Sequence, residues 1–237
     1  MRKDTFFNGR VTICQNKTGY RFSIDAVLLA EHVKPTAGQT VVDLGTGCGV
    51  IPLILCYRHP GVRVYGVEVQ SELAEIAGRN VSENQMSDCI KIICQDMKTL
   101  TIDQFDAPAD IVVSNPPFYK PDAGRLNPNR QRAVARHELE ITLSDVIETA
   151  HRMLIRSGRY ITIYAAERLT DLITEMRRKN IEPKSLRGIY SQKNCSASLV
   201  LVEGIKGGRQ GMTIGAPLVI YCPDGSYTKE VEKLLQP

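Results

Sequence analysis

TVVDLGTGCG, residues 40–49, is the stretch that decides the fold of this 237-residue chain. The apolar residues 40–44 predict a short buried strand, and residues 50–57 predict a helix. The three glycines between them predict a tight turn, since glycine adopts positive φ and lets the backbone approach a ligand closely. A strand, a glycine turn and a helix in this order are typical of a parallel α/β sheet.

The rest of the chain repeats the alternation of strands and helices. Further strands are predicted at residues 63–68, 90–94, 110–114, 158–164, 184–190, 197–203 and 217–221. Helices are predicted from Ser23 to before Pro35 and at residues 71–81, 143–154, 168–179 and 228–235. This alternation predicts a doubly wound, Rossmann-like α/β fold with a parallel sheet and right-handed crossovers.

The length suits one domain with a substantial core, which we expect to span residues 1–237. Residues 1–38 would form an N-terminal cap segment. Residues 204–237 would form a C-terminal extension that begins with a mobile, glycine-rich stretch.

The composition excludes several classes of protein. Seven scattered cysteines without a C-x-x-C pair argue against a disulfide framework and fit a reducing compartment. No apolar run approaches the roughly 18 residues needed to span a bilayer, and no secretory signal is visible. We therefore expect a cytoplasmic protein with no membrane partner and no metal. The net charge of +4 is only mildly basic and does not by itself indicate nucleic acid.

The spacing of the glycine turn narrows the choice of cofactor. A dinucleotide fingerprint would place its third glycine at position 50, where this chain has Val50. Asp43 precedes the turn, and its carboxylate would attract a cofactor with a cationic amino acid end but repel a pyrophosphate. Taken alone, the glycines are equally compatible with a plain structural turn.

Two acidic residues follow later strands. Glu68 ends the strand at 63–68, where a carboxylate can accept hydrogen bonds from both hydroxyls of a ribose; the alternative is an exposed carboxylate in a loop. Asp96 follows the strand at 90–94 and could accept from an adenine amino group while the N–H of Met97 faces a ring nitrogen. A helix N-cap is the alternative for Asp96. Ligands bind at the carboxyl ends of such sheets, where these residues converge.

Asn115-Pro116-Pro117-Phe118 follows the apolar strand at 110–114. Two consecutive prolines fix φ and donate no N–H, so they predict a rigid loop at the strand end. The amide of Asn115 both accepts and donates hydrogen bonds, and Phe118 offers a flat apolar face. This combination suits a planar group that carries an amine, although Asn-Pro also begins ordinary turns.

Two basic clusters follow this loop. The first lies beside the expected site, where phosphate contacts would be useful, and comprises Lys120, Arg125, Arg130, Arg132 and Arg136. The second is better explained as a solvated surface and comprises Arg177, Arg178, Lys179, Lys184 and Arg187. His137 is equally compatible with a base, a structural role and an RNA contact.

These motifs resemble those of class I S-adenosylmethionine-dependent methyltransferases that modify exocyclic amines. With residues 19–25 and 135–138, the chain is similar to the bacterial tRNA1(Val) (adenine-37-N6)-methyltransferase family over roughly residues 8–205. The resemblance implies a seven-stranded sheet with a reversed last hairpin, S-adenosylmethionine as cofactor, and N6 methylation of adenine in RNA, with tRNA preferred. It also implies that Tyr20 and its neighbours help close over the cofactor.

The expected site therefore has three parts. The catalytic residues are Asn115, Pro116, Pro117 and Phe118. The cofactor-binding residues are Tyr20, Asp43, Gly45, Thr46, Gly47, Gly49, Glu68, Val69, Asp96, Met97 and Asn115. The substrate-binding residues are Tyr119, Lys120, Arg125, Arg130, Arg132 and Arg136.

Other readings remain open at the level of sequence. The same Asn-Pro-Pro logic serves glutamine N5 methylation of a release factor and guanine N2 methylation of rRNA, but both families usually have a longer N-terminal part. A DNA adenine enzyme would normally add a recognition domain. Outside this class, the alternatives are an NAD(P)-dependent oxidoreductase and a non-catalytic RNA-binding module. The sequence carries no signal for an oligomeric state.

Overall fold

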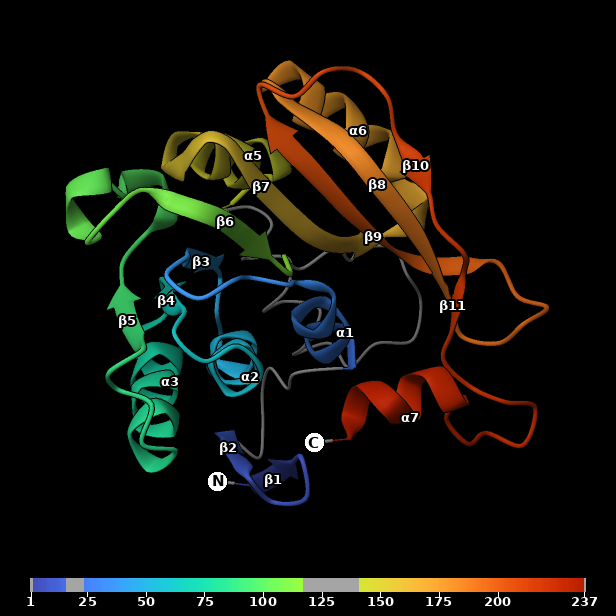
Figure 1. The fold of residues 1–237 in the computed structure, drawn as a ribbon, viewed down its shortest axis with the longest axis horizontal. Coiled ribbons are helices and arrows are strands. Elements are labelled where there is room, and N and C mark those ends of the chain that lie inside the picture. The colour runs from blue at the N-terminus through green and yellow to red at the C-terminus, as the bar shows by residue number, and fades with distance from the viewer. Residues whose placement is uncertain (1, 16–23, 117–140, 237) are drawn as a thin grey trace.

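The computed structural model describes residues 2–15, 24–116 and 141–236. Its centre is a sheet of nine strands in the order β10-β8-β9-β7-β6-β3-β4-β5, and β11 also pairs with β8 (Figure 1). Helices cover both faces of this sheet. The doubly wound α/β fold expected from the sequence is confirmed.

The middle of the sheet is parallel. β3 (Thr40–Leu44) lies between β4 (Arg63–Glu68) and β6 (Ala109–Ser114) and is parallel to both. β5 (Ile90–Cys94) extends the sheet beyond β4, and β7 (Leu154–Ala165) extends it beyond β6. The strand order thus reverses between β3 and β6, which is where ligands bind in such sheets.

The helices divide into two layers with separate cores (Figure 1). α1 (Ile24–His32), α2 (Val50–Arg58) and α3 (Ser71–Glu83) lie on one face, and α5 (Leu143–Met153) and α6 (Leu169–Arg178) lie on the other. Adjacent strand residues serve opposite cores, because side chains alternate along a strand. In β3, for example, Val41 packs with the first layer and Val42 with the second.

The far end of the sheet contains an antiparallel hairpin and two short strands. β8 (Ile181–Tyr190) and β9 (Ala197–Lys206) are antiparallel, and β9 is also antiparallel to β7. β10 (Thr213–Ile214) and β11 (Leu218–Val219) pair in parallel with β8. These two strands bring the sheet to nine rather than the expected seven.

The glycine-rich stretch after β9 does not match the mobile segment expected from its composition. The ammonium of Lys184 donates to the carbonyl of Arg209 at 3.1 Å and to that of Gly211 at 2.6 Å. The guanidinium of Arg187 donates to the carbonyl of Ala216 at 2.8 Å. Side chains of β8 therefore fasten this stretch along the edge of the sheet.

An N-terminal hairpin was not predicted. β1 (Arg2–Phe6) and β2 (Val11–Gln15) form a separate two-stranded antiparallel sheet. Its turn places Phe7, Asn8 and Gly9 at φ of 53°, 56° and 83°. An Asn-Gly pair between apolar runs is a strong hairpin signal, so the sequence did contain the information.

Arg58 ties both ends of the chain to the helical layer. Its Nε donates to Glu31 on α1 at 2.8 Å, and its guanidinium lies 4.2 Å from the ring centroid of Phe7 in the hairpin. Its Nη2 donates to the carbonyls of Leu234, at 3.1 Å, and Gln236, at the end of α7 (Lys229–Leu235). None of the described helices is long and apolar enough to cross a bilayer.

We expect Arg58→Met to lower the free energy of unfolding by about 3 kcal/mol, because it leaves the buried carboxylate of Glu31 unpaired. Urea unfolding would measure the change. The control is Arg63→Met, whose partner Asp106 is 63% exposed, so that variant should lose less than about 1 kcal/mol. Equal losses in the two variants would contradict this account.

Candidate active site

The glycine turn between β3 and α2 has a backbone that favours glycine. Gly45, Gly47 and Gly49 have φ of 76°, 58° and 83°, which other residues rarely adopt. The N–H groups of Gly45 and Thr46 both donate to the carbonyl of Val67 at 2.9 Å. The turn is therefore fastened to the end of β4.

Asp43 is fully buried beneath this turn. Within the described part of the chain, neither oxygen of its carboxyl group has a hydrogen-bond partner, and the buried hydroxyl of Thr46 has none of acceptable geometry. Burial raises the pKa of Asp43 to about 7; the nearby Thr46 hydroxyl lowers it and the charge of Glu68 raises it further. Unsatisfied buried polar groups are costly, so these three oxygens suit a ligand that brings donors.

Glu68 is buried and braces the glycine turn. Its Oε2 accepts from the N–H of Gly47 at 2.9 Å, and its Oε1 accepts from the N–H of Gln70 at 3.0 Å. The alternative of an exposed loop carboxylate is therefore wrong. Each carboxylate oxygen accepts more than one hydrogen bond, so Glu68 keeps capacity for a ligand. Val69, the next residue, is 37% exposed.

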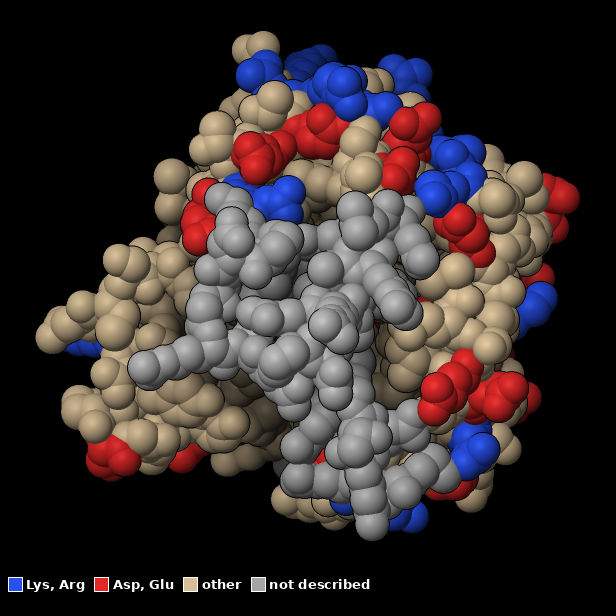
Figure 2. Space-filling view, turned by 180° about the vertical axis from the view of Figure 1, so that it is seen from behind, with Lys and Arg blue, Asp and Glu red and all other residues tan. Residues whose placement is uncertain are grey.

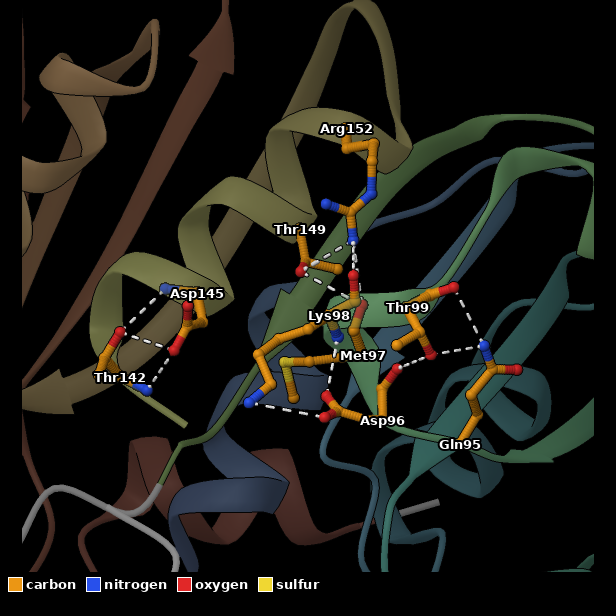
Figure 3. Close-up of polar contacts among 9 residues, drawn as sticks. All are labelled: Gln95, Asp96, Met97, Lys98, Thr99, Thr142, Asp145, Thr149 and Arg152. Carbon is orange, nitrogen blue, oxygen red and sulfur yellow. Dashed lines mark hydrogen bonds and ion pairs between the residues drawn. The ribbon is translucent and has the colours of Figure 1, made fainter. Parts of the chain in front are cut away.

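Asp96 caps the short 3₁₀ helix η1 (Met97–Thr99), which is the alternative considered for it (Figure 3). Its Oδ1 accepts from the N–H of Lys98 at 2.9 Å, and its Oδ2 lies 3.5 Å from the Lys98 ammonium. The side chain is 35% exposed. Capping therefore leaves part of the carboxylate free to meet a ligand.

Helix α5 holds η1 in place through contacts that the sequence analysis missed. The hydroxyl of Thr149 donates to the carbonyl of Met97 at 3.3 Å (Figure 3). The guanidinium of Arg152 donates to the carbonyls of Met97 and Lys98, both at 3.1 Å. The sequence did indicate these contacts, because Thr149 and Arg152 are three residues apart and therefore lie on one face of the predicted helix.

A buried polar cluster lies beneath Asn115. The hydroxyl of Ser114, the last residue of β6, is 2.7 Å from that of Tyr160 and donates to that of Thr162 at 3.2 Å. Thr162 also donates to the Ser114 carbonyl at 2.9 Å. Burial raises the pKa of Tyr160, which keeps its hydroxyl protonated. The cluster fixes the strand end from which the half-buried Asn115 and Pro116 continue.

The remaining predicted site residues lie outside the described part of the chain. They are Tyr20, Pro117, Phe118, Tyr119, Lys120, Arg125, Arg130, Arg132 and Arg136, together with His137. In the described ranges, no three His, Cys, Asp or Glu side chains gather as a metal site would require.

The second basic cluster takes part in internal contacts. Four of its members pair with carboxylates: Arg177 with Glu182 at 3.2 Å, Arg178 with Glu175 at 2.7 Å, Lys179 with Glu148 at 2.5 Å and Arg187 with Glu230 at 2.6 Å. On the face shown in Figure 2, blue Lys and Arg side chains are interspersed with red Asp and Glu. These pairings support the interpretation of the cluster as an ordinary charged surface.

A family model and curated relatives both match this chain, and all of them are methyltransferases. The family model of the methyltransferase small domain matches residues 21–171. A Porphyromonas gingivalis protein named tRNA1(Val) (adenine(37)-N6)-methyltransferase is 35% identical over 178 residues, which are 73% of this chain and 69% of that protein. A Flavobacteriaceae bacterium protein of the same name is 27% identical, over 80% of this chain and 85% of that protein.

Solved structures share the fold. A protein from Agrobacterium tumefaciens described as a predicted O-methyltransferase matches with a TM-score of 0.69 at 22% identity, covering 89% of this chain and 94% of that one. Geranyl diphosphate C-methyltransferase from Streptomyces coelicolor, in complex with S-adenosyl-L-homocysteine, matches with a TM-score of 0.54 at 16% identity, covering 76% and 77%.

The raised pKa of Asp43 predicts how stability changes with pH. The folded state keeps a proton on Asp43 that the unfolded state releases above pH 3.8. The free energy of unfolding therefore falls as the pH rises from about 4 to about 7. Asp43→Asn removes this loss. Its advantage over the wild type, without cofactor, should grow between pH 4 and 7 to at most about 4 kcal/mol and then level off.

Urea unfolding at several pH values measures this difference. Thr46→Val keeps the Asp43 carboxyl group, so it should retain the pH trend of the wild type. Parallel pH profiles for Asp43→Asn and the wild type would show that the carboxyl group is not strained by burial.

Proposed function

The chain belongs to the methyltransferase small domain family, and from this premise we propose that it transfers a methyl group from S-adenosylmethionine to the N6 amine of an adenine in tRNA, of the tRNA1(Val) adenine-37 type. One observation carries the proposal. The register of β3 and β6 pairs Leu44 with Ser114, so Gly45 and Asn115 leave adjacent strands side by side. The cofactor turn and the Asn-Pro-Pro loop thus begin at the same point of the sheet.

The described residues fit the cofactor in three places. The buried, unpartnered carboxyl of Asp43 suits the cationic amino acid end. Glu68, which braces the turn, would accept hydrogen bonds from the ribose hydroxyls. Asp96 and the backbone of Met97 would meet the adenine, on a segment that Arg152 holds in place. The bound cofactor supplies a methyl group activated by a sulfonium.

The Asn-Pro-Pro loop would prepare the acceptor. The side-chain oxygen of Asn115 and the carbonyl of Pro116 accept the two hydrogens of the adenine amine. These bonds favour a pyramidal nitrogen and direct its lone pair at the methyl carbon. As the nitrogen–carbon bond forms, the electrons of the sulfur–carbon bond stay on sulfur and the amine releases a proton to water. Positioning supplies most of the rate.

The base must leave its stack to reach this loop. Adenines in RNA loops are already partly splayed, so the cost is lower there than in a duplex. Stacking on Phe118 and phosphate contacts from the first basic cluster complete the proposal; both belong to residues 117–140, outside the described ranges.

Mass spectrometry of nucleosides from a deletion strain tests the substrate. The proposal predicts loss of N6-methyladenosine from one tRNA species and its return on complementation. An unchanged tRNA profile with a changed rRNA profile would instead support the guanine N2 alternative, and loss of methylglutamine from a release factor would support the protein alternative.

Stabilisation by NAD but not by S-adenosylhomocysteine in a thermal-shift assay would support an oxidoreductase.

Asn115→Ala should separate catalysis from cofactor binding. We expect the turnover of tRNA methylation to fall by about 100-fold or more, because an oxygen that polarises the acceptor is lost. Although Asn115 is also among the expected cofactor-binding residues, the Kd for S-adenosylhomocysteine should stay within about threefold, since the glycine turn, Glu68 and Asp96 are intact. Tritiated methyl transfer and calorimetry measure the two quantities. Near-normal turnover would refute the role of Asn115.

A further inference from the structure

Two asparagines, Asn80 on α3 and Asn84 at its C-cap, replace a β-strand partner for the N-terminal hairpin. Asn80 is fully buried; its Oδ1 accepts from the N–H of Cys14 at 2.8 Å, and its Nδ2 donates to the Cys14 carbonyl at 2.9 Å. Asn84, one turn later, repeats the pattern on Thr12, accepting at 2.8 Å and donating at 2.6 Å. The edge of β2 that does not face β1 is thus bonded by side-chain amides.

Asn80 makes one further contact that Asn84 does not share. Its second Nδ2 hydrogen goes to the carbonyl of Cys48, within the glycine turn, at 2.9 Å. Asn84 uses its second hydrogen on the carbonyl of Asn80, at 2.7 Å. One fully buried amide therefore joins the hairpin, α3 and the cofactor turn, whereas its neighbour joins only the first two.

The Cys48 carbonyl lies between two glycines of positive φ, Gly47 and Gly49. Glycine has few steric limits, so the peptide groups in such a turn rotate readily unless they are bonded. The N–H of Gly47 is held by Glu68, the N–H of Gly49 donates to the Thr46 carbonyl at 3.0 Å, and the carbonyl of Cys48 is held by Asn80. Without Asn80, the turn would sample more conformations, and ligand binding would have to overcome the entropy of ordering it.

We propose that Asn80 is a positioning residue for cofactor binding, which sets the glycine turn in its binding conformation and couples it to the docked N-terminal hairpin. This inference rests on the proposed function only in taking the turn as the cofactor site. Asn80 touches no reacting atom in this account and acts through the backbone of the turn.

Asn84→Ala is a matched control for Asn80→Ala, because both variants remove two hydrogen bonds to β2. Only Asn80→Ala also removes the hydrogen bond to the Cys48 carbonyl. We expect Asn80→Ala to raise the Kd for S-adenosylhomocysteine about tenfold or more. A change of this size corresponds to the net free energy of about one hydrogen bond. Asn84→Ala should stay within about threefold. Calorimetry measures both, and circular dichroism confirms that each variant is folded.

A second variant and a second measurement cover the case in which Asn80→Ala does not fold. Asn80→Asp has nearly the same shape and keeps the acceptor for Cys14, but loses both donors. Without cofactor, its amide hydrogens at residues 45–49 should exchange about tenfold faster than in the wild type, whereas those in Asn84→Ala should not. Unchanged exchange, or equal loss of affinity in the Asn80 and Asn84 variants, overturns the inference.

The two proposals fail in different ways. If the wild type does not bind S-adenosylhomocysteine, the proposed function fails, while hydrogen exchange at the turn still tests Asn80. If the wild type binds and the Asn80 variants bind equally well, only the positioning role fails.

Discussion

A carboxyl group buried without a partner, that of Asp43, is the constraint on which the rest of the site depends. It lies in the central strand, fully buried, under a turn whose glycines offer no side-chain partner to it. Burial, with a smaller contribution from the charge of Glu68, disfavours the ionised form of Asp43, so the cofactor-free fold bears a cost that a cationic ligand relieves. The neighbouring strands surround this point: β4 ends in Glu68, and β6 leads directly into Asn115.

The scaffold braces each part of the site from outside it. Glu68 and Asn80 hold the glycine turn, Arg152 holds η1, and the hydroxyls beneath Asn115 hold the end of β6. Each brace uses a buried or half-buried polar group that bonds to the backbone of the element it holds. Such pre-organisation reduces the conformational entropy that the site loses when a ligand binds, and it thereby increases affinity.

Local patterns predicted the central strands and the convergence of the glycine turn, Glu68, Asp96 and Asn115 at one sheet edge, because hydrophobic period and turn chemistry are local properties. The braces were not predicted, since they join residues far apart in the chain. Ser114 meets Thr162 only because of the β6–β7 register, and Asn80 meets Cys14 only because the hairpin docks on α3. Of the two strands after residue 206, β11 falls within the strand predicted at 217–221. β10 was not predicted, since it depends on an edge that no local pattern specifies.

The most direct test of this account counts the protons released when S-adenosylhomocysteine binds. Calorimetry at pH 6.5 in buffers of different ionisation enthalpy should show net proton release, because the ligand's ammonium group converts the protonated Asp43 to its charged form. The release should fade by pH 8.5, where Asp43 is already ionised, and should be absent in Asp43→Asn. Binding without this release, or with the same release in Asp43→Asn, would contradict the central role of the buried carboxyl group.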